Sequence, residues 1–193
     1  EAGEVQGYVR YRRKGDFTDW LAKGSVLVGE IYASTPEAYV ALWQHILGLD
    51  LVETISWHGG MDEPLLFLLK DPRRTSRNRI DGIWLRIVDV EKALSSRAYG
   101  AEGRLTFEVR DPFLDGAGGR FELEATPDGG VCRRTNAEPE LVLGPEELGN
   151  LYLGGGSAGA LWRAGRIHGN AAAIARADRI FGWHIQPQCQ EGF

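Results

Sequence analysis

The chain has 193 residues, of which 43% are hydrophobic and 25% charged, a balance typical of a globular protein. Its formal net charge of −5 argues against a nucleic-acid-binding protein, which would usually present a basic surface, and it suits a cationic partner. No apolar run approaches the ~20 residues of a membrane span and we recognise no signal peptide, so we expect a cytoplasmic protein that does not associate with membranes.

The first ~60 residues predict the order strand, strand, helix, strand. β-Branched and aromatic residues predict strands at 5–13 and 25–33, separated by a turn or loop at 14–24. Thr35 and Pro36 are typical of a helix start, and Gly48 of a helix end. Between them one apolar face recurs at helical spacing, formed by Tyr39, Leu42, Trp43, Ile46 and Leu47. Residues 51–57 predict the third strand.

Residues 59–79 read as a connection between two units, because glycines and prolines interrupt every pattern there. A short helix can form at 64–70. The basic run at 73–79 is interpreted as solvated surface rather than a phosphate site. Residues 80–89 then predict a strand, with Ile83, Leu85 and Ile87 on one face.

The second half predicts a sheet followed by helices. Asp89 can cap a short helix at 90–97. Residues 104–110 and 120–126 alternate cleanly between apolar and polar, as in half-buried strands, and the turn after residue 126 predicts a hairpin with 131–135. Residues 140–143 add a short strand. Helices are predicted from Pro145 to Leu151, from a cap at Ser157 to about residue 164, and from a cap at Asn170 to Phe181.

Gly154, Gly156 and Gly159 match the spacing G-x-G-x-x-G of a dinucleotide-binding loop. That motif works inside a strand–helix–strand unit, with an acidic residue at the end of the second strand. Here the acidic residue at a comparable distance, Asp178, falls within a helical stretch. The glycines are therefore interpreted as a turn between two helices.

No self-contained catalytic site is evident from the residues alone. The four histidines lack paired metal-ligand spacing, and Cys132 and Cys189 form no C-x-x-C motif, so neither a metal site nor a disulfide framework is predicted. Trp43 and Trp162 are interpreted as packing residues on helices. Trp84 could line a cleft, or it could lie on a second buried face of its strand.

The last eleven residues show neither helical nor strand periodicity, yet they contain Trp183, Ile185 and a final Phe193. Chain ends usually fray unless something holds them. Local sequence therefore leaves two readings open, a loose tail or a tail that docks and places its carboxylate at a fixed point.

The segment from Asp81 to Leu94, followed by Arg97-Ala98-Tyr99, resembles the enhanced intracellular survival (Eis) family of N-acetyltransferases. Segments at 33–43, 64–73 and 141–167 agree with the same family and occur in the same order. Members of that family have a GCN5-related acetyltransferase domain, a central domain of the same fold and a sterol-carrier-like domain. They transfer acetyl groups from acetyl-CoA to amines of the aminoglycoside, polyamine or lysine type, and they assemble as hexamers.

The resemblance implies an α+β fold in two parts. Residues 1–78 would be the C-terminal half of the central acetyltransferase-like domain, and 79–193 a sterol-carrier-like domain with an antiparallel sheet and helices. The chain, which opens at Glu1 without Met, is expected to be a fragment that lacks the acetyl-CoA site and is inactive alone. The acetyl-CoA pyrophosphate loop, Arg/Gln-x-x-Gly-x-Gly/Ala, is not found, since the nearest match, 12–17, ends in Phe17.

The resemblance also assigns roles at the end of the chain. The family's terminal carboxylate reaches the active site as a general base, which would be the carboxylate of Phe193 here. Glu191 is a substrate-binding candidate, although some members place their acidic residue one position later, where this chain has Gly192. Trp84 is the candidate aromatic wall of a substrate pocket. The implied partners are a cationic amine and further copies of the same chain, without a metal.

Two alternatives remain beside the enzyme. Sterol-carrier folds can enclose a tunnel, so the chain could be a module that binds a lipid or another apolar ligand. It could also act as an oligomerisation scaffold that holds the tail. A half-domain at 1–78 would expose sheet edges, from which we expect pairing with a partner chain or partial disorder.

Overall fold

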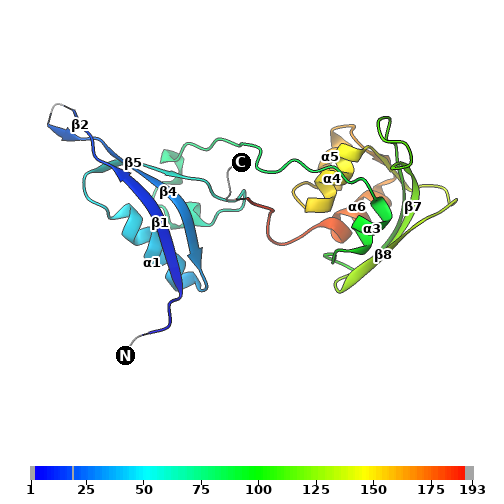
Figure 1. The fold of residues 1–193 in the computed structure, drawn as a ribbon, viewed down its shortest axis with the longest axis horizontal. Coiled ribbons are helices and arrows are strands. Elements are labelled where there is room, and N and C mark those ends of the chain that lie inside the picture. Colours follow the sequence, from blue (N-terminus) through cyan, green and yellow to red (C-terminus); the bar gives the residue numbers. More distant parts are fainter. Residues whose placement is uncertain (1–2, 19, 190–193) are drawn as a thin grey trace. The chain divides into compact units, whose positions relative to one another are not determined.

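The computed structural model describes residues 3–18 and 20–189, which divide into two compact units (Figure 1). Unit 1 contains the residues up to Gly82, together with Gln188 and Cys189. Unit 2 runs from Ile83 to Pro187. Each unit has its own hydrophobic core.

Unit 1 is a three-stranded sheet covered by one helix. The strands β1 (Gly7–Lys14), β4 (Gly24–Ala33) and β5 (Val52–Trp57) lie in the order β1–β4–β5. β1 pairs antiparallel with β4, and β4 pairs parallel with β5 across the helix α1 (Pro36–Leu47). The core between sheet and helix is formed by Val26, Val28, Ile31, Trp43 and Ile46. The expected order strand, strand, helix, strand is confirmed.

Helix α1 begins and ends where the sequence predicts. The side chain of Thr35 accepts a hydrogen bond from the backbone N–H of Ala38, and Gly48 closes the last turn. The segment between β1 and β4 is more ordered than the predicted loop. It contains a small hairpin of β2 (Phe17–Thr18) and β3 (Leu21–Ala22), whose turn includes Trp20 at φ 65°.

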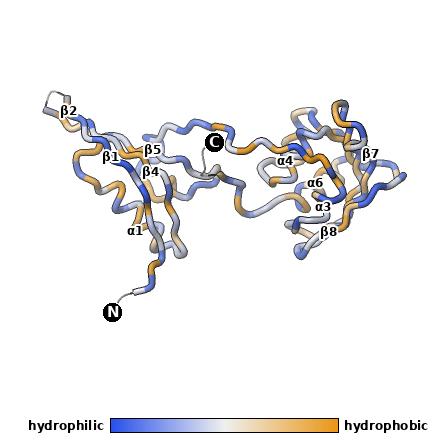
Figure 2. Tube along the Cα trace, in the orientation of Figure 1, coloured by the Kyte–Doolittle hydropathy of each residue, from blue (hydrophilic) through white to orange (hydrophobic). Residues whose placement is uncertain are grey.

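After β5 come the short helix α2 (Leu65–Leu68) and a 3₁₀ turn, η1 (Pro72–Arg74). The predicted strand at 80–89 is wrong, because 75–89 contains no regular secondary structure. Of the expected apolar face only Ile87 is buried, whereas Ile83 and Leu85 remain 47% and 38% exposed. Figure 2 shows hydrophobic positions recurring along this irregular segment. The alternation in sequence is therefore matched by neither a paired strand nor a continuously buried face.

Unit 2 contains a five-stranded sheet in the order β10–β9–β6–β7–β8. Its strands are β6 (Gly103–Val109), β7 (Gly119–Thr126), β8 (Gly129–Arg134), β9 (Leu141–Leu143) and β10 (His168–Gly169). β6 and β9 are parallel, and the other neighbours are antiparallel. The predicted hairpin of β7 with β8 is confirmed, whereas the two-residue β10 was not anticipated.

Helices gather on one face of this sheet (Figure 1). They are α3 (Val90–Ser95), α4 (Pro145–Leu153), α5 (Ala158–Arg163) and α6 (Ala171–Phe181). The side chains of Asp89, Ser157 and Asn170 cap α3, α5 and α6 as expected. Trp162, on α5, exposes 45% of its surface, so the expectation that it is a packing residue is wrong.

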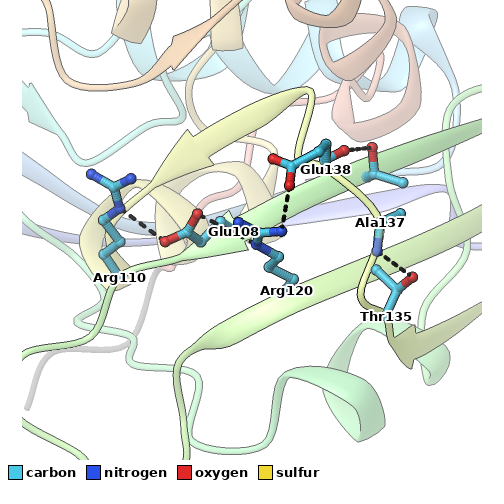
Figure 3. A network of polar contacts seen from close by, with 7 residues as sticks. Glu108, Arg110, Arg120, Thr135, Ala137 and Glu138 are labelled. Atoms are coloured by element: carbon cyan, nitrogen blue, oxygen red, sulfur yellow. Dashed lines mark hydrogen bonds and ion pairs between the residues drawn. The ribbon is translucent and has the colours of Figure 1, made fainter.

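The two faces of the sheet differ sharply. Facing the helices are the alternate residues Leu105, Phe107 and Val109 of β6 and Phe121, Leu123 and Ala125 of β7. Cys132 of β8 joins them, and burial raises the pKa of its thiol to about 12. The other face carries ion pairs, among them Glu108 with Arg110 and Arg120 with Glu138 (Figure 3). Period-two patterning therefore identified this sheet correctly because one face meets the core and the other meets charged partners.

Candidate functional site

The candidate site is the C-terminal tail and the surface of unit 2 from which it departs. Helix α6 ends at Phe181, whose ring meets that of Tyr99 edge-on, with centroids 5.8 Å apart. The backbone N–H of Gly100 donates to the carbonyl of Ile180 at 2.9 Å. A side chain at Gly100 would collide with the carbonyl oxygen of Gly182, so glycine is required for this close backbone approach. The end of α6 is thereby held against 99–100.

A glycine loop, 154–156, lies along the next part of the tail. Gly154 ends α4 in the left-handed conformation, with φ 75°, as expected for a turn between two helices. A Cβ built at Gly154 would lie 3.7 Å from the Cβ of Trp183. A Cβ at Gly155 would lie 3.2 Å from the Cγ of Pro187. The tail therefore runs close to the backbone of this loop.

Arg97 lies beside the same helix end. Its guanidinium carbon is 4.7 Å from the ring centroid of Tyr99, 5.4 Å from that of Tyr152 and 5.6 Å from that of Phe181. It also donates to the backbone carbonyls of Ala98 and Tyr152. Burial lowers the pKa of the guanidinium, and no ion pair to Arg97 occurs within the described residues. Aromatic faces and the negative end of α4 take the place of a carboxylate.

The last described residues belong to unit 1. A Cβ at Gly60 would lie 2.7 Å from the side-chain oxygen of Gln188, and one at Gly82 would lie 3.7 Å from the Cβ of Cys189. Both cysteines are thiols rather than members of a disulfide. Of the expected site residues, Phe193 and Glu191 lie outside the described part of the chain.

Trp84, the third expected site residue, exposes 86% of its surface in unit 2. It is not among the residues that line the cavity beside the start of α3 or the one beside the end of β6. Its indole face is nevertheless open to a ligand. The reading of Trp84 as part of a second buried face is excluded by this exposure.

Asp111 forms a tight polar cluster that the sequence analysis did not single out. Its carboxylate accepts hydrogen bonds from the backbone N–H groups of Phe113 and Leu114, at 2.9 and 3.0 Å, and from Arg86 at 2.6 and 2.7 Å. The two backbone donors, followed by the Arg86 charge, hold the pKa of Asp111 below its usual range. An Asp directly before a Pro and a run of turn residues is typical of such a side-chain-closed turn, so this signal was available.

One cavity of unit 2, of about 550 Å³, lies between the start of α3 and the loop 114–117. Apolar side chains form only part of its lining, and charged residues contribute Asp89, Glu91, Asp115 and Arg134. Arg134 donates to the carbonyls of Gly116 and Gly118 and pairs with Glu91, so its charge is already used within the fold. An opening with this many charges does not favour a lipid or another wholly apolar ligand.

The segment 12–17 does not form an acetyl-CoA pyrophosphate site. Arg12, Arg13 and Lys14 pair with β4 as the end of β1, and the chain continues into the β2–β3 hairpin. A phosphate-binding loop would instead lead into a helix N-terminus, where backbone N–H groups converge. Within 3–18 and 20–189 no three side chains of the metal-binding types converge, and no helix there is long and apolar enough to cross a membrane.

Comparison with known protein families divides the chain in the same order as the fold. Residues 1–87 match the family described as acetyltransferase (GNAT) domain. Residues 90–190 match the family described as sterol carrier protein domain. The first match covers nearly the same residues as unit 1, and the second nearly the same residues as unit 2.

Curated relatives match nearly the whole chain. The N-acetyltransferase Eis of Mycobacterium tuberculosis is 37% identical over 188 residues, which cover 94% of this chain and 44% of that protein. An uncharacterized N-acetyltransferase of Streptomyces avermitilis is 35% identical over 193 residues, which cover 99% of this chain and 47% of that protein. The chain thus spans about half the length of the curated relatives it matches.

Solved structures also resemble this chain over nearly its whole length. Eis1 from Mycobacterium abscessus has a TM-score of 0.82 and 36% sequence identity, covering 97% of this chain and 49% of that one. A GCN5-related N-acetyltransferase from Anabaena variabilis has a TM-score of 0.78 at 24% identity, covering 94% of this chain and 46% of that one. At that identity the second likeness concerns the fold alone.

Proposed function

The chain belongs to the Eis family of GCN5-related N-acetyltransferases, and we propose that its protein transfers an acetyl group from acetyl-CoA to a cationic amine. The observation that carries this proposal is the continuous match of both units, in order, to the N-acetyltransferase Eis. The acceptor would be of the aminoglycoside, polyamine or lysine type. Acetyl-CoA is a cosubstrate here, and since 12–17 does not form its loop, we assign its binding to residues outside this chain.

The proposed part of this chain in the reaction is to supply a base. The carboxylate of Phe193 would take a proton from the ammonium group of the acceptor, directly or through a water molecule. The neutral amine would then form an N–C bond to the acetyl carbonyl carbon as the C–S bond breaks. The second proton that the nitrogen loses on becoming an amide would pass to the departing CoA thiolate, which leaves as the thiol. The negative charge of Glu191 would favour binding of the cationic acceptor, and Trp84 would offer an aromatic face to it.

The composition of the chain supports this assignment in one respect. The net charge of −5 suits a cationic acceptor, whose approach would be favoured by the protein's field. Assembly of further copies, as hexamers, and a cytoplasmic location complete the proposal. The 193-residue chain alone should show no turnover, because it would lack the acetyl-CoA site.

The base is tested by shortening the full-length protein by one residue. We expect deletion of Phe193 to lower kcat by about 10²–10⁴-fold, the usual contribution of a general base. Acetylation of a polyamine or an aminoglycoside by acetyl-CoA, followed through CoA release, measures it. Phe193→Ala is the matched control, because it keeps a terminal carboxylate at the same position and removes only the ring. Unchanged turnover after deletion of Phe193 would exclude the terminal carboxylate as the base.

A further inference from the structure

We propose that Arg97 and the glycine loop 154–156 form a seat that fixes the direction in which the tail leaves unit 2. Arg97 is then a positioning residue for the base, acting through Phe181 and the residues that follow it. This inference rests on the proposed function for its consequence in catalysis. The seat itself can be tested without any turnover.

The first support is the environment of Arg97. If Arg97 only capped the C-terminus of helix α4, contacts with carbonyls of the last turn, such as that of Tyr152, would be enough. Arg97 is also within cation–π distance of Phe181, the last residue of α6. One cation thus holds the end of α4 and the start of the tail to each other. A planar guanidinium can do both at once, whereas an ammonium group cannot stack in this way.

The second support is independent and comes from the glycines. Gly100 admits the backbone of Gly182, Gly154 admits the side chain of Trp183, and Gly155 admits that of Pro187. These contacts follow one another along the tail from its first residue to the end of unit 2. Side chains at Gly100 and Gly155 would enter the path of the tail, whereas a Cβ at Gly154 would make only an ordinary contact with Trp183. The path of the tail is therefore defined both by the absence of side chains at these glycines and by the contacts of Arg97.

The physical consequence concerns orientation. Residues 188–193 continue from Pro187 to the proposed base. A base contributes its full effect only when it is held close to the proton that it removes, because freedom of its carrier lowers its effective concentration. When residues 181–187 are held in place, only the shorter segment after Pro187 must lose conformational freedom for the base to reach its working position. The seat thus accounts for how a base at a chain end could act with precision.

Hydrogen exchange of the full-length protein tests the seat directly. We expect Gly155→Val to raise the exchange rates of the Gly182 and Gly100 amides, which donate to the carbonyls of Asp178 and Ile180, by about 10-fold or more, while amides in β6 and β7 remain protected. Arg97→Lys should do the same, since it keeps the charge and loses the stacking. Gly15→Val is the control, because a Cβ at Gly15 meets nothing within 4 Å. Unchanged exchange of the Gly182 and Gly100 amides in both test variants would overturn the proposal.

Turnover separates positioning from a purely structural role. With Phe193 present, Gly155→Val and Arg97→Lys should each lower kcat by about 10-fold and leave the KM for acetyl-CoA unchanged. In the protein lacking Phe193, the same substitutions should have no further effect. Equal losses in both backgrounds would show that these residues do not act through the tail. If deleting Phe193 itself changes nothing, the proposed base fails, and the exchange rates still decide whether the seat exists.

Discussion

At the scale of single residues, Asp111 shows how backbone donors and one cation fix a charge. Its side chain is 1% exposed, and four hydrogen bonds to it come from two backbone N–H groups and Arg86. These bonds favour the ionised carboxyl, so the pKa of Asp111 is lower in the folded state than in the unfolded chain. The stability linked to this group is therefore fully present above about pH 4 and is lost as the pH falls toward the lowered pKa.

Asp111→Asn should reveal this dependence. We expect the variant to be less stable than the parent at pH 7, because an amide group would present N–H donors to Arg86. The difference in unfolding free energy should shrink as the pH is lowered from about 4 to 2, where the parent carboxyl also becomes neutral. Urea unfolding at a series of pH values measures it, with exposed Asp115→Asn as the control. A difference that is the same at pH 7 and pH 2 would contradict the role of the charge.

Only part of the candidate site could be predicted from the identities of its residues. The apolar residues Trp183 and Ile185 led us to consider a docked tail, and the described part of the tail does run beside the glycine loop. The role of Arg97 could not be inferred, because its partners Tyr152 and Phe181 are distant in sequence and belong to different helices. Contacts of this kind follow from packing and leave no periodic signal. Phe193 and Glu191 stay predictions.

At the scale of elements, patterns succeeded wherever one face of an element meets a core. Helix α1 and strands β6 and β7 occur at nearly the predicted residues, because caps and alternation act locally. The strand predicted at 80–89 is absent because alternation along the sequence ensures neither a hydrogen-bonding partner nor burial of the apolar side, and Ile83 and Leu85 are exposed. Trp162 failed because helical spacing alone does not show which face of a short helix is covered.

Strand β6 allows both faces to be compared within one element. Leu105 is 0% exposed in the core, so Leu105→Ala should lower the unfolding free energy of unit 2 by about 2–5 kcal/mol. Glu108 lies on the opposite face, where it pairs with Arg110 and Arg120 (Figure 3). Glu108→Gln should cost less than about 1 kcal/mol, because solvent screens these pairs. Chemical denaturation at moderate salt measures both, and a larger loss for Glu108→Gln would reverse our assignment of the faces.

At the scale of the whole molecule, the chain consists of two cores joined by an irregular segment. The arginine-rich part of that segment, 73–79, ends the η1 turn and then has no regular structure. Its residue Arg77 donates to the carbonyl of Met61 at 3.2 Å, a single contact on an exposed side chain. Such backbone opens readily to proteases, whereas paired strands do not.

Limited trypsin treatment should therefore cut first within 73–79. The expected products are one fragment that ends in this run and one that begins there and contains the five-stranded sheet. Mass spectrometry of a time course identifies them. The arginines of β6 and β7, Arg104 and Arg120, provide an internal control, because both lie in the paired β6–β7 ladder, opposite Glu124 and Glu108. First cuts at these two residues would show that unit 2 opens more readily than the connection.

The buried thiol of Cys132 gives unit 2 a built-in reporter. At pH 8 a thiol with a pKa near 12, such as that of Cys132, is ionised only on the order of 10⁻⁴ of the time, and the fold also shields it. A fluorophore that reacts with thiolates would therefore leave the sheet of unit 2 dark while its core stays closed. Light appearing at Cys132 would report each opening of that core, so the rarest motion of the unit could be counted at a single atom.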